Sequence, residues 1–400
     1  MIRTALIRAF GLYRKVRLRA LGLRGRSEED VHAERVVSGQ AWEEYCEALK
    51  VAGAALLHGD APRDDFNQIE GYRYLSRLTR AGLEAFIDYS DPAFPYLRRM
   101  AHETVKMGSD NPDNAYYNAQ LDGRYSYVVR GQRNTVHYLG FGLQRGGYFD
   151  EDGLSTSGYL ESEDMHIEDD GSFELFLSPE RPEGARNWLQ TFPNTSMLIV
   201  RQTFLDRVNE REALLSISTL DGPEAPAPLT AKQVDEGLTK AAGLVVASSM
   251  LFARWANEFK RNHPNELPRF DQARSDAAGG VPDIAYYHSY WQLEPDEALV
   301  IEAAPPPCDH WNFQLNNWWM ESLDYRYFRI HVNKHTAAYR ADGSVRVIVA
   351  HEDPGRDNWI QTVGHLRGTM CWRWTRPQVD DPPQPRCRVM KHSELAGLPA

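Results

Sequence analysis

The segment Asp309–Tyr325 reads DHWNFQLNNWWMESLDY and concentrates side chains that could bind or transform a small molecule. Alternate side chains of a β-strand point to opposite faces, so a strand here would have one apolar and one polar face. The apolar face would carry Trp311, Phe313 and Leu315. The polar face would carry His310, Asn312, Gln314 and Asn316. Buried amides and imidazoles need hydrogen-bond partners, so this second face either meets solvent or lines a polar cavity.

An imidazole beside a carboxylate can transfer protons, and two clusters offer this combination. One is the segment above; the other is HEDPGRDNW at 351–359, which His365 follows. The candidate catalytic residues are two bases, His310 and His351, and two carboxylates that would orient them, Asp324 and Asp353. The candidate substrate-binding residues lie in the same stretches: Trp311, Asn312, Gln314, Asn316, Trp318, Arg326 and His365. Among them, Arg326 would hold an anionic group or a developing negative charge.

Simpler interpretations of the 351–359 cluster stay open. The run Asp353-Pro354-Gly355 is also a plain turn, with Asp357 and Asn358 capping local backbone groups. A hard metal ion is a third option for its carboxylates. The spacing matches no metal signature, and the chain has no HExxH or HxH pair, so we expect no metal. We also expect no cofactor, because GFGLQRGG at 140–147 is followed by no helical pattern and is therefore no dinucleotide loop.

The stretch NPDNAYYNAQLDGRY at 111–125 is a third polar cluster. We interpret Asn111, Asp113 and Asn114 as structural, because such residues around a proline bend the chain and satisfy backbone groups. The later polar residues of the stretch, Asn118, Asp122 and Arg124, serve the same purpose or reach a ligand.

The hydrophobic patterns predict an α+β fold. It is mainly an antiparallel, jelly-roll-like β-sandwich with an N-terminal helical region and one long inserted helix. A basic arm at 1–26 precedes the helical region at 27–108, and a linker with the long helix occupies 223–268. Short strands fill a first β region at 109–222 and a second at 269–400, which packs with the first. No internal repeat is apparent.

The charge distribution argues against a nucleic-acid partner. Residues 1–26 hold eight of the 45 basic residues and none of the 56 acidic ones, so the rest of the chain is strongly acidic. The arm lacks the continuous apolar core of a signal peptide. It packs on the acidic body or a neighbouring subunit, or it contacts an anionic membrane surface. The four cysteines lack CxxC spacing, so we expect free thiols in a cytoplasmic protein; Cys371 and Cys387 could pair only in an exported one.

Four stretches together resemble the bacterial family called domain of unknown function 1214. They are NPDNAYYNAQLDGRYSYVVRG (111–131), ARNWLQTFPNTSMLIVRQTF (185–204), ALVIEAAPPPCDHWNFQLNNWWMESLDY (298–325) and HEDPGRDNWIQTVGHLRG (351–368). The resemblance covers most of 100–375, and the last two stretches are the distinctive ones. It implies a jelly-roll-like β-sandwich with added helices, and it makes oligomers plausible. It implies no reaction and supplies no set of catalytic residues.

We expect a cofactor-independent enzyme of the hydrolase or lyase type that acts on a small organic or carbohydrate-like ligand. Aromatic walls with a few polar groups are typical of a small-molecule pocket. The alternative is a non-catalytic carbohydrate-binding or assembly protein, in which indole faces stack on sugar rings and amides bind hydroxyls. A third interpretation assigns the aromatic density to the subunit interfaces of a homo-oligomer.

Overall fold

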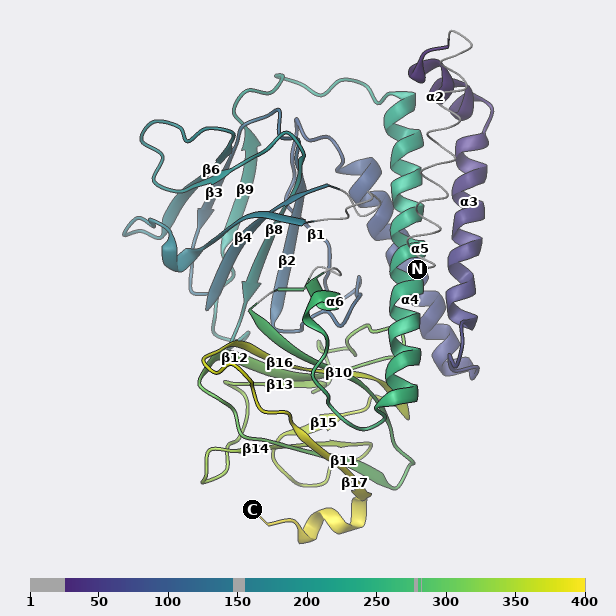
Figure 1. Cartoon of the computed structure of the whole chain (residues 1–400), viewed down its shortest axis with the longest axis vertical. Coiled ribbons are helices and arrows are strands. Elements are labelled where there is room, and N and C mark those ends of the chain that lie inside the picture. The colour runs from purple at the N-terminus through teal and green to yellow at the C-terminus, as the bar shows by residue number, and fades with distance from the viewer. Residues whose placement is uncertain (1–25, 147–154, 277–279, 282, 400) are drawn as a thin grey trace.

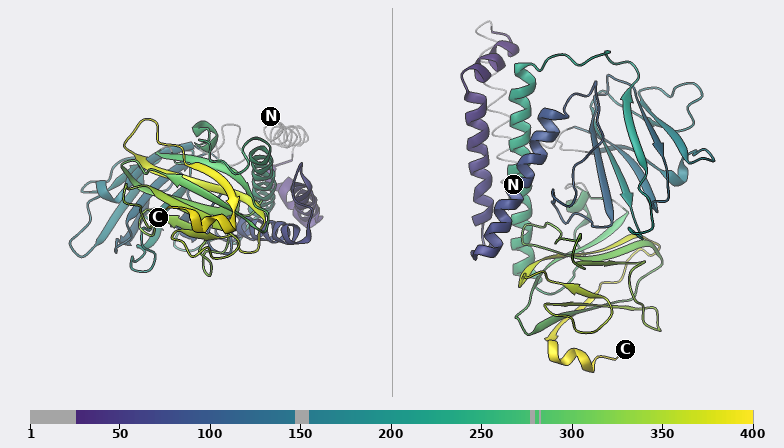
Figure 2. Two further views of the ribbon diagram at one scale, coloured as in Figure 1. Left: turned by 90° about the horizontal axis from the view of Figure 1, so that it is seen from below. Right: turned by 180° about the vertical axis from the view of Figure 1, so that it is seen from behind.

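The computed structural model describes residues 26–146, 155–276, 280–281 and 283–399. Its long helices lie side by side along one flank of the molecule, and two β-sandwiches lie against that flank one after the other (Figures 1 and 2). The main helices are α2 (Glu28–Val37), α3 (Gln40–Gly53), α4 (Asp65–Leu83) and α5 (Ala231–Asn262). The short ones are η1 (Ala54–Leu57), η2 (Glu84–Asp88), η3 (Ser162–Asp164), α6 (Gln272–Asp276) and η4 (His392–Gly397).

Two helices, α2 and α5, begin at reciprocal capping boxes where the sequence places them. Ser27 caps α2, because its hydroxyl accepts from the Asp30 N–H at 3.1 Å while the Asp30 carboxylate accepts from the Ser27 N–H at 3.0 Å. Thr230 and Gln233 form the same reciprocal box at the start of α5. Such a cap contributes about 1 kcal/mol. The predicted long helix is confirmed, and its apolar face is buried against the indoles of Trp318 and Trp319.

The first sandwich consists of a five-stranded and a four-stranded sheet. The five-stranded sheet has the order β1 (Arg98–Arg99), β2 (Asn114–Gln120), β8 (Thr195–Thr203), β4 (Tyr138–Arg145), β5 (Ser155–Glu161). The four-stranded sheet has the order β7 (Trp188–Gln190), β6 (Ser172–Ser178), β3 (Tyr127–Gln132), β9 (Leu214–Thr219). Side chains from both sheets form one hydrophobic core between them.

The second sandwich consists of two four-stranded sheets. One has the order β10 (Ile284–Gln292), β16 (Arg367–Pro377), β12 (Cys308–Asn316), β13 (His331–Asn333). The other has the order β15 (Trp359–Gln361), β14 (Val345–Ala350), β11 (Glu297–Ala303), β17 (Arg386–Lys391). Trp311, Phe313 and Leu315 of β12 lie in the core between these sheets, as their alternation predicted.

The two sandwiches have the same topology. The order β2-β8-β4-β5 in the first sandwich corresponds strand by strand to β10-β16-β12-β13 in the second, each label being higher by eight. In the same way, β7-β6-β3-β9 corresponds to β15-β14-β11-β17. The strand directions agree as well, since the only parallel pairs among the named strands are β6 with β7 and β14 with β15. The described part of the chain therefore contains an internal structural repeat, which corrects the expectation from the sequence that there is none.

Short identical segments accompany this repeat. Ala-Tyr-Tyr occurs at 115–117 in β2 and again at 285–287 in β10, and NWLQT at 187–191 corresponds to NWIQT at 358–362. The ladders align these segments, because Trp188 pairs with Phe176 as Trp359 pairs with Ile348. A few equivalent core positions also keep the residue type, since Phe141 and Leu143 of β4 correspond to Phe313 and Leu315 of β12.

The predicted α+β fold, mainly antiparallel β-structure with an N-terminal helical region and one long helix, is confirmed, and its strands form two sandwiches. Among the described residues, no helix combines the length and the apolar composition that crossing a bilayer requires. The basic arm at 1–26 lies outside the described residues except for its last position, Arg26.

Candidate functional site

The polar face of β12 is buried against the segment 109–114, which leads into the first sandwich. His310 is 2% exposed, and the amide side chains of the same face are fully buried. Gln314 Nε2 donates to the Asp110 carbonyl at 2.9 Å, and Asn316 Nδ2 donates to Ser109 Oγ at 3.0 Å. The face therefore does not meet solvent. It meets another part of the chain, and this contact joins the two sandwiches.

Arg373 of β16 donates hydrogen bonds to carbonyl oxygens of the amide side chains on this face. Its Nη1 donates to Asn312 Oδ1 at 3.2 Å and to Gln314 Oε1 at 2.6 Å, and its Nη2 donates to the Ser109 carbonyl. The NH₂ groups of the three amides donate to 109–114. The carbonyl oxygens of Asn312 and Gln314 accept from the guanidinium, and that of Asn316 accepts from Gln314 Nε2 at 2.6 Å. Every member of this amide ladder (Asn312, Gln314, Asn316 and Arg373) is thus hydrogen-bonded, which is what makes a buried polar network tolerable.

Asp113 is the acidic centre of the contact. One carboxylate oxygen, Oδ2, lies 3.2 Å from His310 Nε2 and accepts from Asn312 Nδ2 at 2.9 Å. The other, Oδ1, lies 3.1 Å from His331 Nε2 and accepts from Asn333 Nδ2 at 2.9 Å. Burial alone would raise the pKa of Asp113, but the contacts with His331 and His310 hold that pKa well below its usual range. Asp113 is therefore a buried carboxylate between two imidazoles.

The second ring nitrogen of each imidazole, Nδ1, could accept a proton. Nδ1 of His310 and Nδ1 of His331 are buried and have no hydrogen-bond partner among the described residues. A carboxylate that accepts from Nε2–H leaves a lone pair on Nδ1. This is how an orienting carboxylate and a general base are arranged in acid–base sites. The His331 side chain is 21% exposed and that of His310 is 3% exposed, so His331 is the one nearer to solvent.

The first sandwich holds an equivalent cluster with different chemistry. Its strands β4 and β5 place Tyr138, Tyr159 and Glu161 at the positions of His310, His331 and Asn333. The Tyr138 hydroxyl contacts that of Tyr159 and donates to Glu161 Oε1 at 3.1 Å. Arg376 of the second sandwich pairs with Glu161, just as Asp113 of the first sandwich reaches the two histidines.

Equivalent backbone hydrogen bonds within each sandwich hold the segments that precede β2 and β10. Phe204 N–H donates to the Asp113 carbonyl at 2.8 Å, and Arg376 N–H donates to the Asp283 carbonyl at 2.8 Å. Each of the two clusters receives a charged side chain from the other sandwich, and of the two clusters the one on the second sandwich contains the imidazoles.

The pairing of His310 or His351 with Asp324 or Asp353, suggested by the sequence, is corrected by their actual partners. Asp324 forms an ion pair with Arg326 at 2.7 Å, with both side chains about one-third exposed. Asp353 accepts from the Gly355 N–H at 2.8 Å and so belongs to a turn. His351 Nδ1 lies 2.9 Å from Thr362 Oγ1. Of these two histidines, His310 is the one that contacts a carboxylate, and that carboxylate is Asp113.

His365 belongs to a different network, which joins α4 to the second sandwich. Its Nε2 lies 2.7 Å from Glu70 Oε2, and Asn317 Nδ2 donates to both Glu70 and Glu321 at 3.0 and 2.9 Å. Arg77 of α4 completes the network through Glu321 at 2.6 Å. These contacts fix the helical flank against the sandwich.

The candidate indoles are core residues. Trp311 is fully buried and stacks on Trp372 with ring centroids 5.0 Å apart, while its Nε1 donates to the Tyr339 hydroxyl at 3.0 Å. Trp318 is fully buried against Tyr290. Neither ring presents a face to which a sugar could bind without displacing these neighbours.

A thiol and an imidazole also meet in the second sandwich. Cys371 Sγ lies 3.9 Å from His288 Nε2. Burial raises the pKa of the Cys371 thiol to about 11 and lowers the pKa of His288 to about 3. Both groups are therefore neutral near pH 7, which is the opposite of an activated thiolate–imidazolium pair. All four cysteines are free thiols.

The sequence interpretation missed Asp113, His331, Asn333 and Arg373. Asp113 was interpreted as a turn residue, because its neighbours Asn111, Pro112 and Asn114 are typical of a bend. One usable signal was present: His331 and Asn333 alternate on a short strand as His310 and Asn312 do. Two neighbouring strands with the same His-x-Asn pattern would place these polar groups on one face.

The comparisons with known proteins identify relatives but no activity. The family described as "Protein of unknown function (DUF1214)" matches residues 149–203 and 294–379. The chain is 48% identical to a putative uncharacterized protein from Burkholderia cenocepacia, whose crystal structure superimposes with a TM-score of 0.86 and covers 92% of this chain and 100% of that one. The VPA0106 protein from Vibrio parahaemolyticus has 13% identity and a TM-score of 0.45, over 86% of this chain and 100% of that one. No curated protein matches. The chain belongs to the DUF1214 family.

Proposed function

We propose that the protein is an enzyme of the hydrolase or lyase type whose acid–base centre is Asp113 with His331 and His310. The observation that carries this proposal is one buried carboxylate with each oxygen on the Nε2 of a different imidazole, while both Nδ1 atoms lack a hydrogen-bond partner among the described residues. The substrate class is a small organic or carbohydrate-like molecule that offers a weakly acidic O–H or C–H group.

His331 is the proton-transfer group in this proposal, because it is the more exposed imidazole. Its Nδ1 would take a proton from the substrate while Nε2–H stays on the Asp113 carboxylate. The imidazolium is stabilised by that carboxylate and then returns the proton to the leaving group or product. General acid–base transfer of this kind contributes about 10²–10⁴-fold to a rate.

Comparison of the two sandwiches supports a chemical rather than a purely structural role. The first sandwich makes the equivalent contact with two phenols, Glu161 and Arg376. Joining the repeats therefore does not require imidazoles. Imidazole is the side-chain type suited to proton transfer near neutral pH, and phenol and guanidinium groups are not.

The test is a turnover screen with matched variants. Wild-type protein is assayed against panels of chromogenic esters, glycosides and uronic-acid oligosaccharides. Any activity found is expected to fall about 100-fold or more in His331→Gln and in Asp113→Asn. His137→Gln is the control, because His137 also contacts a carboxylate, Asp309 at 3.1 Å, but lies outside the cluster. Full activity in His331→Gln would contradict the proposal, as would the absence of turnover across the panels.

A non-catalytic role is the second candidate, and the complete amide ladder favours it. The ladder satisfies its buried groups and binds 109–114 firmly to the second sandwich. If this is the whole function of the cluster, substitutions at Asp113 and His331 will lower the free energy of unfolding and change no activity. Measuring unfolding and turnover on the same variants separates the two candidates.

A further inference from the structure

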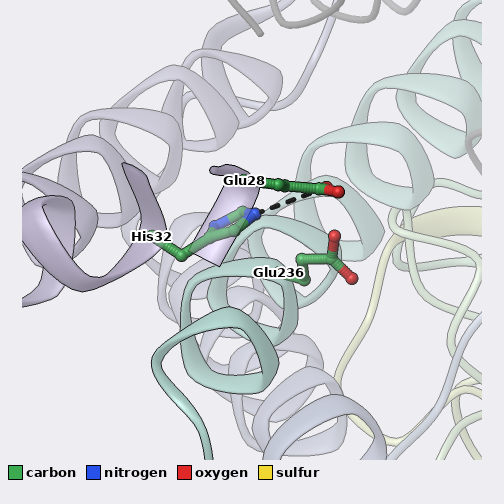
Figure 3. Close-up of side chains that lie close together, drawn as sticks. All are labelled: Glu28, His32 and Glu236. Carbon is green, nitrogen blue, oxygen red and sulfur yellow. Dashed lines mark ion pairs between the residues drawn. The ribbon is translucent and has the colours of Figure 1, made fainter. Parts of the chain in front are cut away.

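A second group of ionisable side chains lies where α2 packs on α5, away from the Asp113 cluster. Glu28 and His32 are one turn apart on α2, so they share a face of that helix. Glu236 comes from the first turns of α5. One potential ligand atom of each residue lies within 4.8 Å of the other two. Figure 3 shows the imidazole and the two carboxylates around a common space between the helices.

His32 has an unused nitrogen in this space. Its side chain is 2% exposed, and its Nε2 is buried without a hydrogen-bond partner among the described residues. The carboxylate oxygen Oε1 of Glu28 stands 3.7 Å from that nitrogen, which is too long for a hydrogen bond. A buried polar atom without a partner is costly, so this nitrogen indicates a place for a ligand.

The other nitrogen of His32 is held as it is in metal-binding histidines. Asp235 Oδ2 lies 2.6 Å from His32 Nδ1. Arg35 fixes that carboxylate by donating to it from Nε at 2.9 Å and from Nη2 at 3.0 Å, and Glu44 in turn holds Arg35. A carboxylate that accepts from Nδ1–H orients the ring and leaves the Nε2 lone pair for a metal ion.

We propose that Glu28, His32 and Glu236 form a binding site for one divalent transition-metal ion, with Zn²⁺ the best match. The donors are one imidazole nitrogen and two carboxylate oxygens. Imidazole favours zinc-like ions over Mg²⁺ and Ca²⁺, which prefer all-oxygen sites. Bonds of about 2.0–2.2 Å would draw the three ligand atoms somewhat closer together. The bound ion would cross-link α2 to α5, and waters would complete its coordination.

Lys232 competes with the ion in this arrangement. Its Nζ lies 3.4 Å from Glu28 Oε1, and both side chains are nearly half exposed. The lysine can swing into solvent when a cation binds. Removing its charge while keeping its alkyl stem, in Lys232→Met, is therefore expected to tighten metal binding.

The experiment is isothermal titration of the full chain, freed of metal by chelation, with ZnCl₂ at pH 7, together with thermal unfolding. Wild-type protein is expected to bind one Zn²⁺ at this site and to unfold about 3–5 °C higher at a zinc concentration about 100 times Kd. Glu28→Gln and His32→Gln are expected to weaken binding about 100-fold or more, since outer partners of a ligand alone are worth about 10–100-fold. MgCl₂ in place of ZnCl₂ is expected to give no comparable shift.

The matched control is Glu29→Gln, which removes the same charge from the same helical turn but lies outside the ligand group. It is expected to bind Zn²⁺ like the wild type. Glu28 is about half exposed, so Glu28→Gln carries the test even if His32→Gln fails to fold. Equal Zn²⁺ affinity in Glu28→Gln and Glu29→Gln would overturn the proposal, and so would the absence of a zinc-dependent shift in the wild type.

Discussion

The carboxylate of Asp113 and the imidazole of His331 meet at 3.1 Å across the two sandwiches, although 218 residues separate them in the chain. Asp113 directly precedes β2 of the first sandwich, and His331 lies in β13 of the second, in sheets of equivalent topology. In the opposite sense, Arg376 of the second sandwich pairs with Glu161 of the first. The interface between the sandwiches therefore contains charged contacts made in both directions.

Acid sensitivity of the fold tests the charge on Asp113. The pKa of Asp113 lies well below its ordinary value of 3.8 in the folded state. The ionised carboxylate thus stabilises the fold above about pH 4, and this stabilisation is lost as the pH falls below that value. Chemical denaturation of wild type and Asp113→Asn between pH 3 and pH 7 should show a steeper loss in the wild type. At pH 7 the variant should be less stable by about 3 kcal/mol. Parallel pH profiles would contradict the assigned role.

Removal of the guanidinium tests the amide ladder. In Arg373→Met, the carbonyl oxygens of Asn312 and Gln314 lose a charged donor while staying buried. We expect the free energy of unfolding to fall by about 3 kcal/mol, because each unsatisfied buried acceptor costs about 1–3 kcal/mol. Arg326→Met removes a partly exposed ion pair from the same sandwich and should cost at most about 1 kcal/mol. Urea titration of both variants measures the difference, and equal costs would show that the ladder adds no stability.

Thiol reactivity tests the environment of Cys371. This thiol is fully buried, and burial raises its pKa to about 11. An aromatic disulfide reagent at pH 8 should therefore leave Cys371 unmodified in the native protein and modify it after unfolding. Comparison with Cys371→Ser identifies the signal: the variant should lose one reactive thiol in denaturant and none in native buffer. Rapid native modification of Cys371 would mean that the second sandwich opens readily.

A glycine substitution tests the close packing between β16 and β12. A Cβ at Gly368 would lie 2.2 Å from the Asn316 carbonyl oxygen, so the backbone of β16 or β12 must move in Gly368→Ala. We expect a loss of about 2–3 kcal/mol, as for other overpacked sites. Gly53→Ala is the control, because Gly53 ends α3 with open space around its Cα. That change should stabilise the protein by about 0.5–1 kcal/mol. Thermal unfolding of both variants checks the opposite signs.

The sequence by itself determined those features that depend on local pattern. The capping residues and apolar period of α5 predicted that helix, and the alternation in 309–316 identified Trp311, Phe313 and Leu315 as core. The same alternation showed that His310 and the three amides share a face that must find polar partners. Caps and periodicity act between residues a few positions apart, and for this reason they can be interpreted without the fold.

Only the tertiary structure decided which partners that face finds. Asp113 looked like a turn residue, and Asp324 looked like a partner for His310, because neighbours in sequence are the only candidates a single chain offers. The true pairing depends on how the two sandwiches pack against each other, which no local pattern encodes. The Glu28, His32 and Glu236 group arises in the same way, from the packing of α2 on α5. Long-range packing, not residue type, brings these groups within reach of one another.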